Sequence, residues 1–239
     1  MNTGQHETSC RLVSFRSKAL FALILLVPAP SLGTLAGMVL FPHTTLGTAL
    51  FAAAKVWLLA FPLVWHLCID RERLSLSPPR HGGFIAGIFS GIVLSVAILA
   101  AFVACGSLLV DRTVFVRKVT EVGLGSVGLY CVGAAYWILV NSVLEEYVWR
   151  WFCVKQCMRI MPSWVAVACA ALFFTLHHSV ALATMLPPGS VALCSAGIFV
   201  GGAVWSWMYT RYQSVWPCYV SHAIVDICVF GIGAWMVFG

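Results

Sequence analysis

The stretch from Phe84 to Leu109 reads FIAGIFSGIVLSVAILAAFVACGSLL and contains no charged residue. A helix needs about 20 apolar residues to cross the roughly 30 Å hydrocarbon core of a bilayer, and this stretch exceeds that length. Of the 239 residues, 61% are hydrophobic and 9% are charged, whereas about 25% of a soluble domain is charged. So few charges exclude a soluble globular enzyme, a disordered chain and a nucleic-acid-binding protein. The sequence therefore predicts an integral membrane protein.

Seven segments have the length and apolar character of spanning helices. They predict an all-α, polytopic membrane helical bundle of about seven helices, with eight as the alternative count. The segments cover approximately residues 19–41, 47–68, 84–110, 124–148, 162–184, 191–209 and 216–238. The loops between them are too short for a soluble domain. We therefore expect a cytoplasmic segment at residues 1–18 and a single transmembrane domain over residues 19–239.

The first segment contains Pro28 and Pro30, which are expected to kink its helix. A cleaved signal peptide is the alternative interpretation of this segment. The basic residues Arg11, Arg16 and Lys18 would make an unusually long leading region for a signal peptide, and this favours a retained helix.

The distribution of basic residues predicts the orientation, because cytoplasmic loops carry an excess of Lys and Arg. With the N-terminus in the cytoplasm, the outer side receives only Arg112, Arg117 and Lys118. The inner side receives a larger set: Arg11, Arg16, Lys18, Arg71, Arg73, Arg80, Arg150, Lys155, Arg159 and Arg211. We expect a multi-pass protein with a cytoplasmic N-terminus. The absence of eukaryotic targeting signals favours a bacterial inner membrane.

Two local patterns predict how the helices are arranged. The segment from Trp149 to Met161 mixes aromatic and basic residues, which is typical of a short helix lying at the cytoplasmic interface. Pairs of small residues four positions apart allow close contact between helices. These pairs are Gly33/Gly37, Gly87/Gly91 and Gly197/Gly201.

Ionisable side chains inside the predicted spans mark the candidate site, because burying one in hydrocarbon costs at least about 2.5–3.5 kcal/mol. Lys55 and His66 are expected to snorkel to the interfaces. The other six fall on the fourth, fifth and seventh spans: Glu145, Glu146, His177, His178, His222 and Asp226.

Helical geometry assigns different directions to these side chains. Glu146 and Arg150 lie about 40° apart around a helix, so they are expected to pair. Glu145 points about 100° away from Glu146 and is free to face the bundle interior, where it suits a general base acting on water. The adjacent residues His177 and His178 also diverge by about 100°, so we expect only one of them to face Glu145.

On the seventh span, His222 and Asp226 are one helical turn apart, so the carboxylate can orient the imidazole. Together with Glu145, such groups could activate a water and stabilise an oxyanion. They could equally bind a divalent metal such as zinc, and spacing does not separate the two chemistries. The ten cysteines form no C-x-x-C pair, so they predict no zinc ribbon.

Three motifs occur in order, each on its own predicted helix, within about residues 124–238. They are Glu145-Glu146-x-x-x-Arg150, then Phe-x-x-x-His, then His222-x-x-x-Asp226. This pattern resembles the CPBP (CAAX protease and bacteriocin-processing) family, which includes the type II CAAX prenyl endopeptidases. The resemblance implies an intramembrane endopeptidase acting on a membrane-associated protein or peptide within the lipid bilayer.

The resemblance also implies a role for each matching residue. Glu145 would activate the attacking water together with the histidine of the second motif. His222 would stabilise the oxyanion, aided by Asp226, and Glu146 and Arg150 would support the site. Family members were long described as metalloproteases. We favour a glutamate-activated water and expect no cofactor, with zinc as the open alternative.

The second motif can be read in two registers, Phe173–His177 or Phe174–His178. The small and aliphatic residues that follow Phe174 match the usual family pattern. This favours His178 as the active histidine and keeps His177 as the alternative.

The predicted helix ends leave one inconsistency in depth. Glu145 falls near the inner end of its predicted helix, which favours a cleft open to the cytoplasmic half of the bilayer. The histidine of the fifth span would lie deeper, because it follows Pro162 by about four helical turns.

Other functions fit parts of this pattern. One is a non-catalytic immunity or scaffold protein that retains the packing of the motifs. Another is a haem-binding membrane cytochrome with ligands among His66, His177, His178 and His222. A proton-coupled transporter is disfavoured because we find no internal repeat. The sequence selects neither a particular substrate nor an oligomeric state.

Overall fold

A computed structural model describes the backbone of residues 3–239, together with their side chains except for residues 3–14 and 107–109. Residues 1 and 2 of the predicted segment 1–18 lie outside the described residues. The described part of the chain is helical and contains no β-strand. Seven of its helices are long and apolar enough to cross a membrane, which confirms the predicted all-α membrane bundle.

The first three spans come from the N-terminal half of the chain. The first is interrupted at Val27, directly before Pro28, as the two prolines predict. Its parts are α1 (Thr3–Leu26), α2 (Pro28–Leu35) and the π-helix η1 (Ala36–Leu40). The second span consists of α3 (Thr45–Val64) and the π-helix η2 (Trp65–Ile69), and the third span is α4 (Phe84–Leu109).

The C-terminal half contains one short helix, α5 (Arg112–Glu121), and the other four spans. The fourth span is a continuous helix with two π-helical stretches: α6 (Val127–Tyr136), η3 (Trp137–Asn141), α7 (Ser142–Glu146), η4 (Tyr147–Val154) and α8 (Lys155–Met158). The last three are α9 (Ser163–Ala183), α10 (Pro188–Tyr212) and α11 (Val215–Phe238).

The predicted interfacial helix at residues 149–161 is wrong, because the fourth span continues through it to Met158. Trp149 and Phe152 are buried in the hydrophobic core of the bundle. Arg150 is fully buried beside Glu146, so it is not a loop charge as the orientation argument assumed. The mixed composition of this segment reflects an ion pair inside the bundle rather than contact with a membrane surface.

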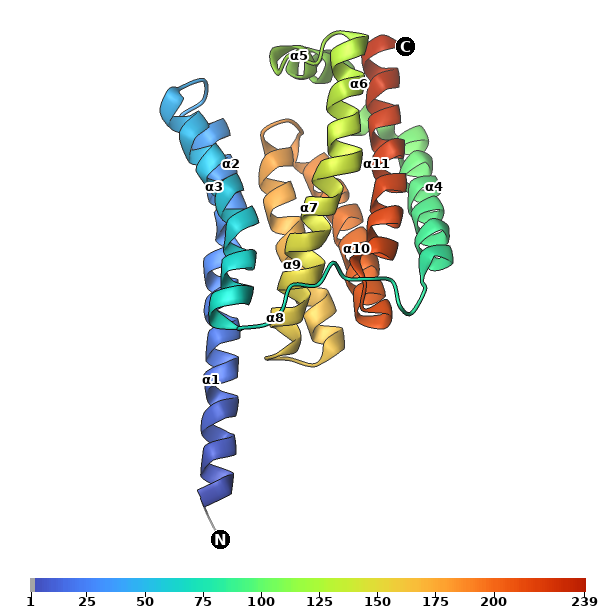
Figure 1. Ribbon diagram of the computed structural model, residues 1–239. Helices are drawn as coiled ribbons and strands as arrows, with labels where there is room; N and C mark the ends of the chain where they lie inside the picture. The colour runs from blue at the N-terminus through green and yellow to red at the C-terminus, as the bar shows by residue number, and fades with distance from the viewer. Residues whose placement is uncertain (1–2) are drawn as a thin grey trace.

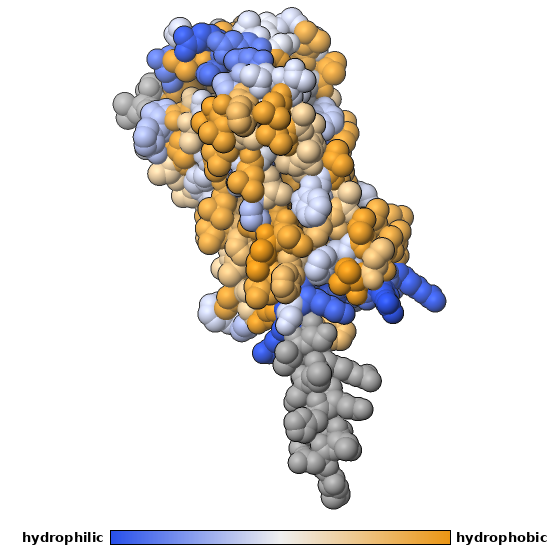
Figure 2. All heavy atoms as spheres, turned by 90° about the vertical axis from the view of Figure 1, so that its left-hand side faces the viewer, coloured by the Kyte–Doolittle hydropathy of each residue, from blue (hydrophilic) through white to orange (hydrophobic). Residues whose placement is uncertain are grey.

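The two chain ends lie at opposite ends of the bundle (Figure 1). The loop from residue 70 to residue 83 crosses the end at which the N-terminus lies. There Arg159 Nη1 lies 2.7 Å from Asp70 Oδ1, and Ser214 Oγ donates to the carbonyl oxygen of Ser77 over 2.6 Å. Figure 2 shows a broad apolar band with hydrophilic residues at both ends, as a protein crossing a membrane requires.

Glycines allow α4 to pack closely against α11, which carries part of the candidate site. A Cβ atom added at Gly87 would lie 2.5 Å from the carbonyl oxygen of Pro217, and one at Gly91 would lie 3.0 Å from that of Ser221. Gly33 similarly lies against Ala54, with 2.4 Å between the added Cβ and that of Ala54. Gly197, by contrast, has nothing within 4 Å of an added Cβ.

We expect Gly87→Ala to lower the thermal stability of the detergent-solubilised protein by an amount equivalent to about 1–3 kcal/mol. The added methyl group meets backbone and can be accommodated only if α4 and α11 separate. Gly197→Ala is the matched control and should leave the melting temperature unchanged or raise it slightly, since alanine favours a helix. Equal melting temperatures for the two variants would show that the close α4–α11 contact does not stabilise the fold.

Candidate active site

The length of the fourth span removes the inconsistency in depth. Glu145 lies roughly 20 Å from Met158 at about 1.5 Å per residue, and His178 lies about 22 Å from Ser163. The sequence expectation placed Glu145 near a helix end because it ended this helix too early. Both side chains instead lie at a similar height, well inside the bundle.

Glu145 lies between histidines from two other spans. Its Oε1 atom is 4.0 Å from His178 Nε2, and its Oε2 atom is 3.7 Å from His222 Nε2. The amide of Asn141, one turn earlier on the same helix, donates to Oε1 over 2.9 Å. The carboxylate is thus held in a fixed direction, and 16% of its side chain remains exposed.

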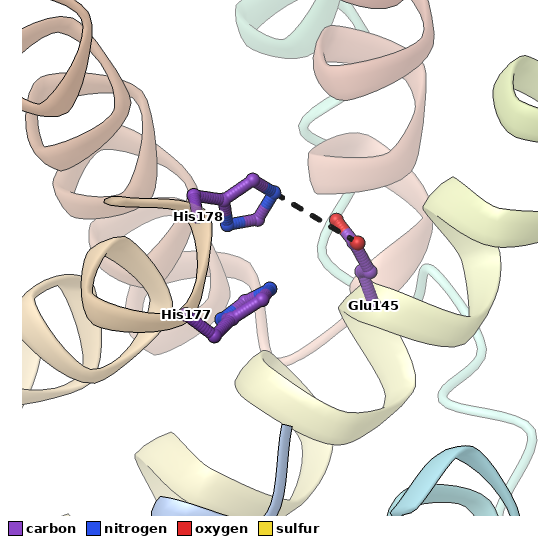
Figure 3. Close-up of side chains that lie close together, drawn as sticks. All are labelled: Glu145, His177 and His178. Atoms are coloured by element: carbon purple, nitrogen blue, oxygen red, sulfur yellow. Dashed lines mark ion pairs between the residues drawn. The ribbon is translucent and has the colours of Figure 1, made fainter. Parts of the chain in front are cut away.

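The orientation of His178 leaves one ring nitrogen available to face Glu145. Its Nδ1–H donates to the carbonyl oxygen of Phe174 over 2.9 Å, which assigns the proton of the neutral ring to Nδ1. Nε2 then carries a lone pair, and Figure 3 shows the His178 ring facing the Glu145 carboxylate.

His177 also points toward Glu145, so the expectation that only one of the two histidines would face it is wrong (Figure 3). Its ring stacks on Trp149, with centroids 5.1 Å apart, and it lies 4.0 Å from the ring of His178. The two Cβ atoms diverge around the helix, but the side chains rotate back toward one another. His177 Nδ1 is buried without a hydrogen-bond partner among the described residues.

These three side chains form a donor set that fits a divalent metal. Glu145, His177 and His178 each offer one ligand atom, and the three atoms lie within 4.8 Å of one another. One carboxylate and two imidazoles are ligands that zinc accepts in catalytic sites. A zinc ion bound there would polarise a carbonyl group or activate a water.

Glu146, rather than Asp226, is the carboxylate that orients His222. His222 Nδ1–H donates to Glu146 Oε1 over 2.8 Å. Asp226 Oδ1 lies 3.7 Å from the other ring nitrogen, and its Oδ2 accepts a 2.6 Å hydrogen bond from Ser142. The sequence argument considered only carboxylates on the same helix as His222, whereas the closer one comes from the fourth span.

The predicted pair between Glu146 and Arg150 is present and fully enclosed. Arg150 Nη1 lies 3.2 Å from Glu146 Oε1, and neither side chain is exposed. The guanidinium lies over the rings of Phe174 and Trp205, at 4.5 and 5.0 Å from their centroids. The Trp205 ring also stacks on His222, with centroids 4.1 Å apart and planes at 18°. Trp205 therefore packs against both the arginine and the histidine, which meet at the same oxygen of Glu146.

Three residues of the site were not singled out from the sequence. Asn141 and Ser142 stand one turn before Glu145 and Glu146 on the same helix, a spacing that could have revealed them. Trp205 lies on a span without an ionisable residue near the site, and nothing in the sequence distinguishes it from other core tryptophans.

His66 is far from this site and does not join the other histidines. It is buried at the end of the second span, where Nε2 lies 3.0 Å from the carbonyl oxygen of Arg73. Its ring packs on Trp151 with centroids 4.6 Å apart. The described residues therefore bring together only three of the four candidate haem ligands.

We expect Arg150→Met to destabilise the protein by about 3–5 kcal/mol, because it leaves the carboxylate of Glu146 buried without a counter-charge. Unfolding in detergent, followed by circular dichroism, measures this loss. Arg117→Met is the matched control: its pair with Glu121 is exposed at 3.9 Å, so its loss should cost no more than about 1 kcal/mol. Similar losses for the two variants would contradict a structural role for the enclosed pair.

The stretch of sequence that contains these site residues matches the model of one known protein family. Residues 127–228 match the family model described as type II CAAX prenyl endopeptidase Rce1-like. The matched stretch includes Glu145, both histidines of α9, His222 and Asp226, and the match confirms the resemblance found in the sequence. No curated protein and no solved structure matches the chain.

Proposed function

We propose, because residues 127–228 match the family model of the Rce1-like type II CAAX prenyl endopeptidases, that this chain is an intramembrane endopeptidase. It would hydrolyse a peptide bond of a membrane-associated protein or peptide within the bilayer. The observation that carries the proposal is the position of the Glu145 carboxylate, between Nε2 of His178 and Nε2 of His222.

In this proposal Glu145 is the general base and His178 helps to position the water. Glu145 Oε1 and His178 Nε2 are 4.0 Å apart, so one water molecule can hydrogen-bond to both at about 2.8 Å. Glu145 takes a proton from the water as its oxygen attacks the scissile carbonyl carbon. The same carboxyl group then returns the proton to the leaving amine. The hydrogen bond from Asn141 keeps the carboxylate aimed at the water.

His222 stabilises the oxyanion of the tetrahedral intermediate. Its Nδ1–H is committed to Glu146, so a second proton on Nε2 makes it a donor on the side that faces Glu145. Asp226, fixed by Ser142, lies 3.7 Å from that nitrogen and stabilises the protonated ring. Glu146 and Arg150 are positioning residues, because they hold His222 without facing the attacking water.

This mechanism needs no bound metal. If zinc were used, Glu145, His177 and His178 would hold it, and the metal would supply the electrophile that activates the water. We favour the metal-free mechanism because Asn141 and the carbonyl oxygen of Phe174 already fix Glu145 and His178 in complementary orientations.

We also propose that the N-terminus is cytoplasmic and that the membrane is a bacterial inner membrane. The charge distribution supports this orientation after Arg150 and Lys155 are removed from the loop charges. Arg71, Arg73, Arg80, Arg159 and Arg211 all lie in or next to loops at the end of the bundle where the N-terminus lies.

Proteolysis is tested without a known substrate by comparing the new termini in membrane proteomes of cells that express wild type or Glu145→Gln. The substitution keeps the shape of the side chain but removes the base, so termini produced by the wild type should be lost. Glu121→Gln, on the short helix α5, is the matched control and should retain them. Matching profiles for wild type and Glu145→Gln, at equal protein levels, would instead favour a non-catalytic immunity or scaffold protein.

The peptide identified in that comparison then tests metal dependence with the purified protein. Cleavage should continue in the presence of EDTA and in the His177→Ala variant. Loss of cleavage in both, with recovery of the wild type on addition of zinc, would replace the metal-free mechanism by the metal-dependent one.

A further inference from the structure

Lys55 is a charged residue near the middle of the second span. At about 1.5 Å per residue it lies roughly 15 Å from Thr45 and about 21 Å from Ile69, the two ends of this span. A lysine side chain adds only four methylene groups to that reach, so its ammonium group cannot extend to either interface. Snorkelling alone therefore leaves the ammonium group short of both ends of the span, and its charge needs a further explanation.

Lys55 lies at the height of the candidate active site. Measured along their helices from the end of the bundle where the N-terminus lies, Lys55, Glu145 and His178 are each about 20 Å deep. The contact between α3 and the fourth span supports this alignment. Tyr147, two residues after Glu145, donates from its hydroxyl group to the carbonyl oxygen of Leu59 over 3.0 Å. Leu59 is one turn from Lys55 and shares its helix face.

Lys55 also lies within electrostatic range of the Glu145 carboxylate and the His177 ring. The second span therefore carries one cation at the height of the proposed catalytic residues. It comes from a part of the chain that the family match at residues 127–228 does not cover.

The ammonium group has no counter-ion among the described residues. None of the ion pairs between described residues involves Lys55, and its Nζ atom lies over the ring of Phe51, 5.7 Å from the centroid. The side chain is exposed, and 16% of Glu145 and 29% of His178 are exposed as well. Glu145 cannot serve as the counter-ion, because Asn141 and two histidines already surround it. An ammonium group at this depth would be stabilised further by an anion that arrives with a ligand.

We propose that Lys55 binds a carboxylate group of the substrate and thereby selects peptides that carry one close to the scissile bond. The inference rests on the proposed endopeptidase function and adds a specificity-determining residue to it. The carboxylate would otherwise be repelled by Glu145, and Lys55 offsets that repulsion while holding the peptide against the catalytic helices. Two sources share this chemistry: the α-carboxylate of a peptide C-terminus and the side chain of Asp or Glu.

Binding measured without turnover tests the role of Lys55. The full chain carrying Glu145→Gln is reconstituted in lipid nanodiscs and titrated into a fluorescent, S-prenylated tetrapeptide in three forms. The forms end in a free carboxylate, in a carboxamide, and in a carboxamide that follows a glutamate residue. Each is measured by fluorescence anisotropy with Lys55 intact, with Lys55→Met, with Lys55→Arg and with Lys118→Met as the matched control on α5.

The carboxylate form should bind at least about tenfold more tightly than the plain carboxamide. Lys55→Met should abolish this preference without weakening carboxamide binding, whereas Lys55→Arg and Lys118→Met should keep it. If the glutamate-containing form also binds more tightly than the plain carboxamide, Lys55 accepts a side-chain carboxylate. If only the form with a free C-terminus does so, Lys55 binds the α-carboxylate.

A purely structural lysine would weaken all three forms equally, so that result overturns the proposal. It is also overturned if no form binds, or if the preference survives in Lys55→Met. None of these binding results contradicts the endopeptidase function as long as cleavage in cells depends on Glu145. Absence of that cleavage overturns the function itself, and the substrate role of Lys55 with it.

Discussion

The ion pair between Glu146 and Arg150 is the constraint on which the rest of the site depends. Both side chains are fully enclosed inside a bundle that lies in hydrocarbon, where an unpaired charge is costly. Phe174 of α9 and Trp205 of α10 pack against the guanidinium, and Glu146 reaches His222 of α11. One pair of charges thus fixes how four spans meet, and it does so directly beside the candidate catalytic residues.

This arrangement explains why two adjacent glutamates have different environments. Glu146 points into the core and has its charge matched by Arg150, so it can hold His222 in one orientation. Glu145 points in another direction and lies partly exposed between His178 and His222. The π-helical stretches on both sides of residues 142–146 mark this segment as unusual, and such stretches occur frequently at functional sites. One turn of helix therefore supplies both the anchor of the site and its proposed base.

Much of the fold could be predicted from the sequence, because each span needs a long apolar stretch and each buried charge needs a reason. The candidate residues could be chosen on the same grounds, and their catalytic roles stay predictions. The end of the fourth helix could not be predicted, since a pair between Glu146 and Arg150 suits an interfacial helix end as well as the enclosed position that the structure shows. The bond between Glu146 and His222 joins different spans and leaves no periodic signal. For Lys55, depth within the helix and not hydropathy decides whether the side chain can reach the interface.

The central claim is that Glu145 activates a water molecule that attacks the peptide bond directly. A single turnover in water enriched in oxygen-18, with a peptide found by terminus profiling, tests it by mass spectrometry. Direct attack predicts the label in the new C-terminal carboxylate of the product and none in the protein fragment that contains Glu145. Label in the Glu145 carboxylate would mean that Glu145 attacks the carbonyl carbon itself, and this result would contradict its assignment as a general base.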